Sequence, residues 1–194
     1  MKKAAWFPLL LMTAAVFAPG CTNKQGETEA PVFLTVTIAS QPVVVDVGTA
    51  APVVISSLTV ASHLKNPTQT DPQGFAGVTL ESYTVHFRRV DGGTRVPADL
   101  SLPSGAFIPS GGSASLTNNT ILLASMRQLS PFDQLLPFNG GFDRETGKDE
   151  IDIAFDITFF GHTVAGQRVA TETVVVGPLQ FRFIASASTS RNTR

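Results

Sequence analysis

Five carboxylates gather within ten residues late in the chain, and oxygen ligands of this kind are what a hard cation such as calcium requires. Three of them, Asp143, Glu145 and Asp149, have a spacing similar to that of a calcium-binding loop. However, Gly147 comes one place too early for the helix-flanked loop, and neighbouring basic residues offset the negative charge. The sequence therefore favours a solvated acidic turn, with a calcium site as the alternative.

Other residue types with chemical potential are scattered. His63, His86 and His162 show no pair at metal-ligand spacing. The chain contains no G-x-S-x-G elbow, no G-x-x-x-x-G-K phosphate loop, no H-E-x-x-H and no C-x-x-C motif. We therefore expect no catalytic residues, no cofactor and no enzyme activity.

The only cysteine, Cys21, follows an N-terminal segment with the pattern of an export signal. Lys2 and Lys3 are followed by an apolar run over residues 4–17, which is shorter than the roughly twenty residues that span a bilayer as a helix. We predict that residues 1–20 are a cleaved signal peptide and that Cys21 becomes the N-terminus. A disulfide within the chain is excluded because Cys21 has no partner.

Residues 17–21, with the sequence Phe-Ala-Pro-Gly-Cys, resemble the lipobox of bacterial lipoproteins. The resemblance implies a diacylglyceryl thioether and an N-acyl group, such as palmitate, on Cys21. Several acyl chains on one residue anchor a protein stably, so lipid on Cys21 would make the membrane contact. Thr22, rather than Asp, follows the cysteine, which in a Gram-negative cell implies delivery to the outer membrane.

The remaining chain has the length of one domain. Residues 21–31 lack large apolar side chains and are predicted to form a flexible tether, residues 32–186 a single domain, and residues 187–194 a disordered tail. Two of the 14 basic residues lie in the signal, so 12 remain against 15 acidic ones, without a basic cluster. This balance argues against nucleic acid as a partner.

Apolar and polar residues alternate over several segments, which predicts half-buried β-strands. In residues 78–90 one face carries Tyr83, Val85 and Phe87, and residues 151–159 have an isoleucine or phenylalanine at every second place. Two final strands are expected on either side of Gly177 and Pro178, so that the last three strands form an antiparallel meander. The predicted strands cover residues 34–38, 43–47, 53–60, 78–90, 151–159, 168–176 and 179–185.

One segment predicts a helix. Ser130 can cap it, Pro131 suits its first position, Asp133 lies in its first turn and Pro137 ends it. Residues 121–129 fit a strand or a helix equally well. Together these elements predict an all-β fold, an immunoglobulin-like antiparallel β-sandwich with one short helical insert.

The same segment holds the candidate contact surface. Phe132, Leu135, Leu136 and Phe138 either plug an open end of the sandwich or contact a partner, and plugging is favoured because large exposed apolar patches are rare. We expect a membrane-tethered, non-catalytic lipoprotein of the cell envelope that acts in binding or assembly, with an envelope protein as a possible partner. The alternative is a β-sandwich module that binds a carbohydrate or calcium through its end loops.

Overall fold

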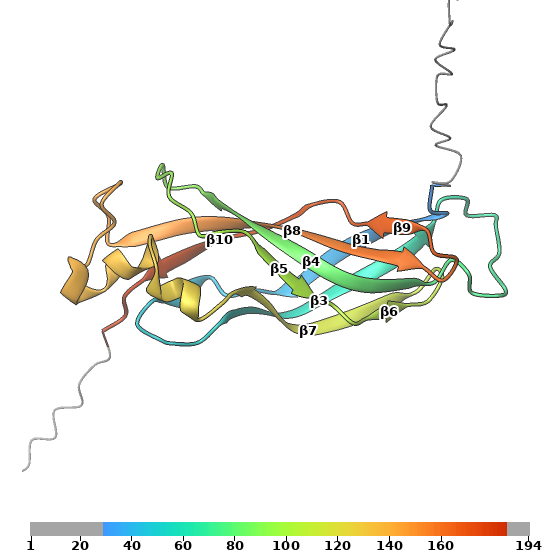
Figure 1. Ribbon diagram of the computed structural model, residues 1–194, viewed down its shortest axis with the longest axis horizontal. Helices are drawn as coiled ribbons and strands as arrows, with labels where there is room; N and C mark the ends of the chain where they lie inside the picture. The colour runs from blue at the N-terminus through green and yellow to red at the C-terminus, as the bar shows by residue number, and fades with distance from the viewer. Residues whose placement is uncertain (1–28, 186–194) are drawn as a thin grey trace, which may run out of the picture.

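The computed structural model describes residues 29–185, and their strands form two sheets of an all-β fold (Figure 1). The smaller sheet is antiparallel, with β3 between β1 and β7. Its strands are β1 (Val32–Ser40), β3 (Val53–Leu64) and β7 (Ser113–Leu122).

The larger sheet has β8 and β4 at its centre. Its order is β2-β10-β8-β4-β5, with the short β6 paired to β4 and β9 paired to β8. All of its pairs are antiparallel except β2 with β10, which is parallel. Its strands are β2 (Val44–Asp46), β4 (Val78–Arg89), β5 (Leu100–Pro103), β6 (Phe107–Ile108), β8 (Glu150–Thr163), β9 (Arg168–Ala170) and β10 (Val174–Arg182).

The predicted alternation of buried and exposed residues in β4 and β8 is confirmed. Tyr83, Val85 and Phe87 of β4 are buried, and Phe155 of β8 lies edge-on to Phe87 with the ring centroids 5.3 Å apart. Buried residues of the smaller sheet, such as Leu58, belong to the same core. The Tyr83 hydroxyl donates a hydrogen bond of 2.8 Å to the carbonyl of Thr120 in β7 and so links the two sheets.

The last strands differ from the predicted meander. β8 continues through Gly161 to Thr163, where a Cβ at position 161 would lie 2.2 Å from the carbonyl oxygen of Thr79. β10 continues through Gly177 and Pro178 with a register shift instead of ending there. β9 and β10 both pair along the edge of β8 opposite β4, so the strands do not follow one another across the sheet.

The helical insert also differs from the expected single helix. It consists of the 3-10 turns η1 (Ser125–Gln128), η2 (Phe132–Leu135) and η3 (Pro137–Asn139). Ser130 provides no side-chain cap, Pro131 precedes η2, and Pro137 begins η3 rather than only ending a helix. A proline at 137 lacks the N–H that a continuing helix needs. The ambiguous residues 121–129 contain the end of β7 and then η1.

The two ends of the long axis carry different features. The chain enters β1 at one end, where Glu29 pairs with Lys65 at 2.7 Å, while the 3-10 turns lie at the opposite end (Figure 1). Between residues 29 and 185 there is no helix long and apolar enough to cross a membrane. The predicted signal peptide with the lipobox, Cys21, most of the tether and the whole of the tail lie outside the described residues.

Candidate functional site

Of the four candidate contact residues, two are buried in the core. Phe132 and Leu135 are 0% and 1% exposed, and the ring of Phe132 packs on Phe181 with centroids 4.4 Å apart. These two side chains therefore close the end of the core and do not lie on the surface. Leu136 is half-buried, and Phe138 is 81% exposed.

Two other apolar side chains of this segment are exposed near Phe138 in the sequence. Leu129 is 62% exposed and Phe142 is 47% exposed. We refer to Leu129, Phe138 and Phe142, which lie in or beside the 3-10 turns in the sequence, as the end patch. The exposed residues of the end patch are thus close in sequence to Phe132 and Leu135, whose side chains are buried in the core.

Arg127 of η1 is a buried cation that sequence analysis missed. The residue is 4% exposed, its Nη1 donates a short hydrogen bond to the carbonyl of Ala51, and its Nε is buried without a hydrogen-bond partner. Burial lowers the pKa of Arg127, and the charge of Asp46 acts in the opposite direction. No sequence motif marks this position, because Arg127 lies in a segment that could be strand or helix.

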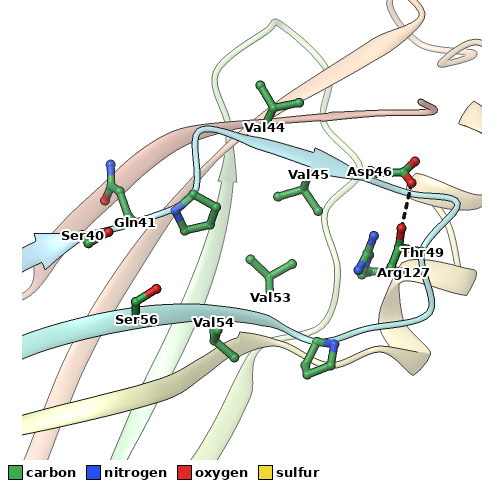
Figure 2. A pocket seen from close by; sticks show the side chains of 12 residues that line it. Ser40, Gln41, Val44, Val45, Asp46, Thr49, Val53, Val54, Ser56 and Arg127 are labelled. Carbon is green, nitrogen blue, oxygen red and sulfur yellow. Dashed lines mark hydrogen bonds between the residues drawn. The ribbon is translucent and has the colours of Figure 1, made fainter. Parts of the chain in front are cut away.

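Arg127 lines two open cavities. One, of about 440 Å³, is drawn in Figure 2. The β1–β2 connection and β2 line one of its sides, and the start of β3 lines the other. The other, of about 410 Å³, lies between the β2–β3 loop and the 3-10 turns, and Phe138 contributes to its wall. Both volumes are within the range of small-molecule sites.

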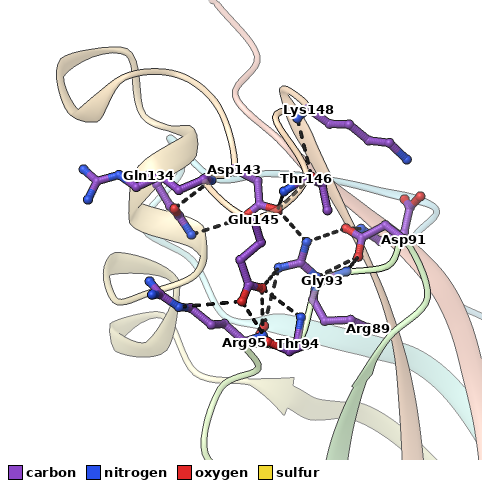
Figure 3. Close-up of polar contacts among 12 residues, drawn as sticks. Arg89, Asp91, Gly93, Thr94, Arg95, Gln134, Asp143, Glu145, Thr146 and Lys148 are labelled. Atoms are coloured by element: carbon purple, nitrogen blue, oxygen red, sulfur yellow. Dashed lines mark hydrogen bonds and ion pairs between the residues drawn. The ribbon is translucent and has the colours of Figure 1, made fainter.

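A second buried arginine, Arg89, ends β4 and faces two buried carboxylates (Figure 3). Its Nε and Nη2 donate to the two oxygens of Asp91, each at 2.7 Å, in a bidentate pair. Nη2 also lies 2.7 Å from Oδ2 of Asp143. The side chains of all three residues are at most 1% exposed.

The carboxylates in this network receive further donors. Asp91 accepts the backbone N–H groups of Gly93 and Asp152, both at 3.1 Å. Asp143 accepts the Nε2 amide of Gln134 at 3.2 Å and the hydroxyl of Thr146 at 2.7 Å. Charge-assisted hydrogen bonds of this kind offset the cost of burying ions. The network therefore ties the β4–β5 loop, η2 and the turn before β8 together.

The hydrogen bonds set the pKa values of the two aspartates. Burial alone would raise the pKa of Asp91, but the bonds from Arg89 and the two N–H groups outweigh it and lower the pKa to about 2. Burial also opposes ionisation of Asp143, and the bonds from Arg89 and Thr146 again leave its pKa lowered. Both carboxylates are thus ionised at neutral pH.

The structure places the three calcium candidates in different roles. Asp143 faces Arg89, and Glu145 accepts hydrogen bonds from the N–H and hydroxyl of Thr94 and from the N–H of Arg95, all at 2.8 to 2.9 Å. Asp149 is exposed. Across residues 29–185, no three acidic, histidine or cysteine side chains form a group that could hold a metal ion. The acidic turn is therefore a partner of Arg89 and does not assemble these three carboxylates into a ligand set.

The three histidines lie in separate polar contacts. His63 contacts the Thr35 hydroxyl at 2.9 Å, His86 contacts Asp99 at 2.8 Å, and His162 contacts Glu81 at 3.1 Å. They do not share a centre.

Comparison with known proteins adds no relative. No protein-family model, no curated protein and no solved structure matches this chain.

Proposed function

We propose that the protein is a lipid-anchored component of the cell envelope, at the outer membrane, whose domain binds or assembles with an envelope protein and catalyses no reaction. The observation that carries this proposal is that the 3-10 turns, in or beside which the exposed end-patch residues lie, are at the end of the domain opposite the chain entry (Figure 1). A tether that begins at Cys21 reaches the domain from the entry end. The end patch then lies at the end of the domain farther from the point of attachment, so a protein partner is the occupant that we propose for it.

The finer fold that we propose is the immunoglobulin-like sandwich, and strand order supports it. The first, third and seventh strands form one sheet, and the fourth, eighth and tenth strands are neighbours in the other. The same division places strands A, B and E against C, F and G in immunoglobulin domains. β5 beside β4 corresponds to the additional strand C′ of variable-type domains.

A binding role also fits the use of the buried charges. Arg89, Asp91 and Asp143 neutralise one another through ion pairs and hold loops in place, so the role of this ionisable cluster is structural. It fixes the turn before β8 and, through Gln134, the η2 turn between Leu129 and Phe138 of the end patch. A contact surface on ordered turns loses less conformational entropy when a partner binds.

The lipid anchor is tested by the Cys21→Ser variant. We expect the wild-type chain to incorporate a labelled fatty acid and to sediment with membranes, and the variant to lose the label. Absence of label from the wild-type chain would refute the anchor.

The partner surface is tested by Phe138→Ser, with Phe107→Ser as the matched control because Phe107 is 54% exposed on β6, at the entry end (Figure 1). Crosslinking in intact cells should capture the same envelope protein with the wild type and with Phe107→Ser, and lose it with Phe138→Ser. Interface energy concentrates in a few apolar anchors, so one substitution suffices. Equal capture by both variants, with unchanged melting temperatures, would place the partner elsewhere.

A further inference from the structure

The two buried arginines of this domain are neutralised to different extents. Arg89 has ion pairs with Asp91 and Asp143 at 2.7 Å, whereas Arg127, also more than nine-tenths buried, has no ion pair in the described part of the chain. Its one hydrogen bond is from Nη1 to the carbonyl of Ala51, and its Nε has no acceptor. A buried charge without a counter-ion is costly, so this arrangement calls for an anion.

The described part of the chain does not supply that anion. Asp46 is the carboxylate whose charge acts on Arg127, but no ion pair joins these two side chains. Its Oδ1 accepts the N–H groups of Gly48 and Ile184, both at 3.0 Å, and its Oδ2 accepts the Thr49 hydroxyl at 2.7 Å. Asp46 is therefore occupied in fixing its own loop and the end of β10.

The cavity of about 440 Å³ beside Arg127 has polar residues at both ends and two valines between them (Figure 2). Arg127, Asp46 and Thr49 lie at one end, and Ser40, Gln41 and Ser56 lie at the other. The side chains of Val45 and Val53 point into the space between the ends, whereas those of Val44 and Val54 point away from it. A ligand that reaches Arg127 and contacts Val45 and Val53 has one anionic group and an aliphatic body.

We propose that Arg127 binds the carboxylate of a small aliphatic acid in this cavity, with the hydrocarbon part of the acid against the valines. A guanidinium forms charge-assisted hydrogen bonds with a carboxylate, and Nη2 of Arg127 is the donor that we assign to the ligand, because Nη1 already donates to Ala51 and Nε is fully buried. Burial of the chain against valines adds affinity in proportion to the apolar area. The site is independent of the lipid anchor and of the end patch.

The probe for this site is hexanoate, and hexanol is its uncharged counterpart. In titrations of the purified full chain followed by calorimetry, we expect hexanoate to bind and hexanol to bind about tenfold more weakly, because one charge-assisted hydrogen bond is worth that factor or more. Equal affinity for the two probes, or no binding of hexanoate to the folded chain, would overturn the proposal. So would preferential binding of an uncharged sugar.

Two variants separate binding from a structural role of Arg127. Arg127→Gln should abolish the preference for hexanoate over hexanol. Because that variant removes a buried contact, Asp46→Asn is the second test: it removes the negative charge nearest the site and keeps an oxygen acceptor. We expect Asp46→Asn to bind hexanoate about threefold more tightly and hexanol unchanged. A folded Asp46→Asn protein with unaltered affinity for hexanoate would overturn the assignment.

Discussion

Replacing Arg89 by Met removes the cation of the buried network and keeps a long apolar side chain in its place. Asp91 and Asp143 then remain buried without their common partner. The pKa of Asp91 is about 2 in the folded protein against an ordinary value of 3.8, a difference that corresponds to about 2 kcal/mol. The lowered pKa of Asp143 adds to this. Breaking a buried ion pair by removing one partner costs about 3 to 5 kcal/mol, and we expect Arg89→Met to lose that much at pH 7.

The pH dependence has a defined sign. In the wild type, the contribution of Asp91 is fully present above pH 3.8 and is lost as the pH falls toward 2. In Arg89→Met, burial becomes the main influence on Asp91 and raises its pKa, so the variant regains stability as the pH falls and the carboxylate becomes neutral. The stability difference between the two proteins should therefore shrink steadily from pH 7 to pH 3.

Urea unfolding followed by far-ultraviolet circular dichroism at several pH values measures this difference. Arg88→Gln is the control, because Arg88 is the next residue on the same strand, its side chain is 50% exposed, and its pair with Asp156 is 3.6 Å long. It should cost less than about 1 kcal/mol. A deficit for Arg89→Met as small as that of the control, or one that stays constant from pH 7 to pH 3, would refute the reasoning.

Three further predictions concern the core and its closure. Leu135→Ala should lower the free energy of unfolding by about 2 to 5 kcal/mol, because Leu135 is 1% exposed. Phe138→Ala should leave the melting temperature nearly unchanged, because Phe138 is exposed. Equal melting curves for the two variants would contradict the closure of the core by η2. Tyr83→Phe should cost about 1 kcal/mol in urea unfolding, since it removes the hydrogen bond to Thr120, and no loss would mean that the bond contributes nothing net. Gly161→Ala should reduce stability or soluble yield, because its Cβ would meet the carbonyl of Thr79 at 2.2 Å, and a fully stable variant would show that β8 shifts there.

The sequence was informative where burial follows a local period. The alternation in β1, β4 and β8 and the β-branched run in β3 predicted strands that the structure contains, and the alternation placed Phe87 and Phe155 in the core. It missed β7, whose residues are mostly small and polar, because that strand is defined by its pairing with β3. The strand end expected at residue 159 and the break expected at Gly177 were wrong, since strand pairing with β4 and β8 overrides the local preference of Gly161 and Gly177 for turns.

The candidate site was predicted less well than the strands. The acidic turn was identified as a polar loop, but its partner Arg89 was not, although the alternation already placed position 89 in the series of Val85 and Phe87. A charge at the end of a strand is usually solvated, so nothing local indicated that Asp143, 54 residues away, would neutralise it. Arg127 had no signal at all.

The residues alone thus determined the all-β class and the inward faces of the long strands, because these depend on composition and on the period of two. Lipid on Cys21 stays a prediction from a contiguous signal. Only the tertiary structure decided that Arg89 is neutralised while Arg127 has no ion pair among residues 29–185, that Phe132 closes the core while Phe138 is exposed, and that the chain entry and the 3-10 turns lie at opposite ends. The physical reason is that the counter-ion of a buried charge, or the side chain that covers an apolar residue, can come from any part of the chain. Which residues meet depends on sheet register and loop packing, and not on their distance in the sequence.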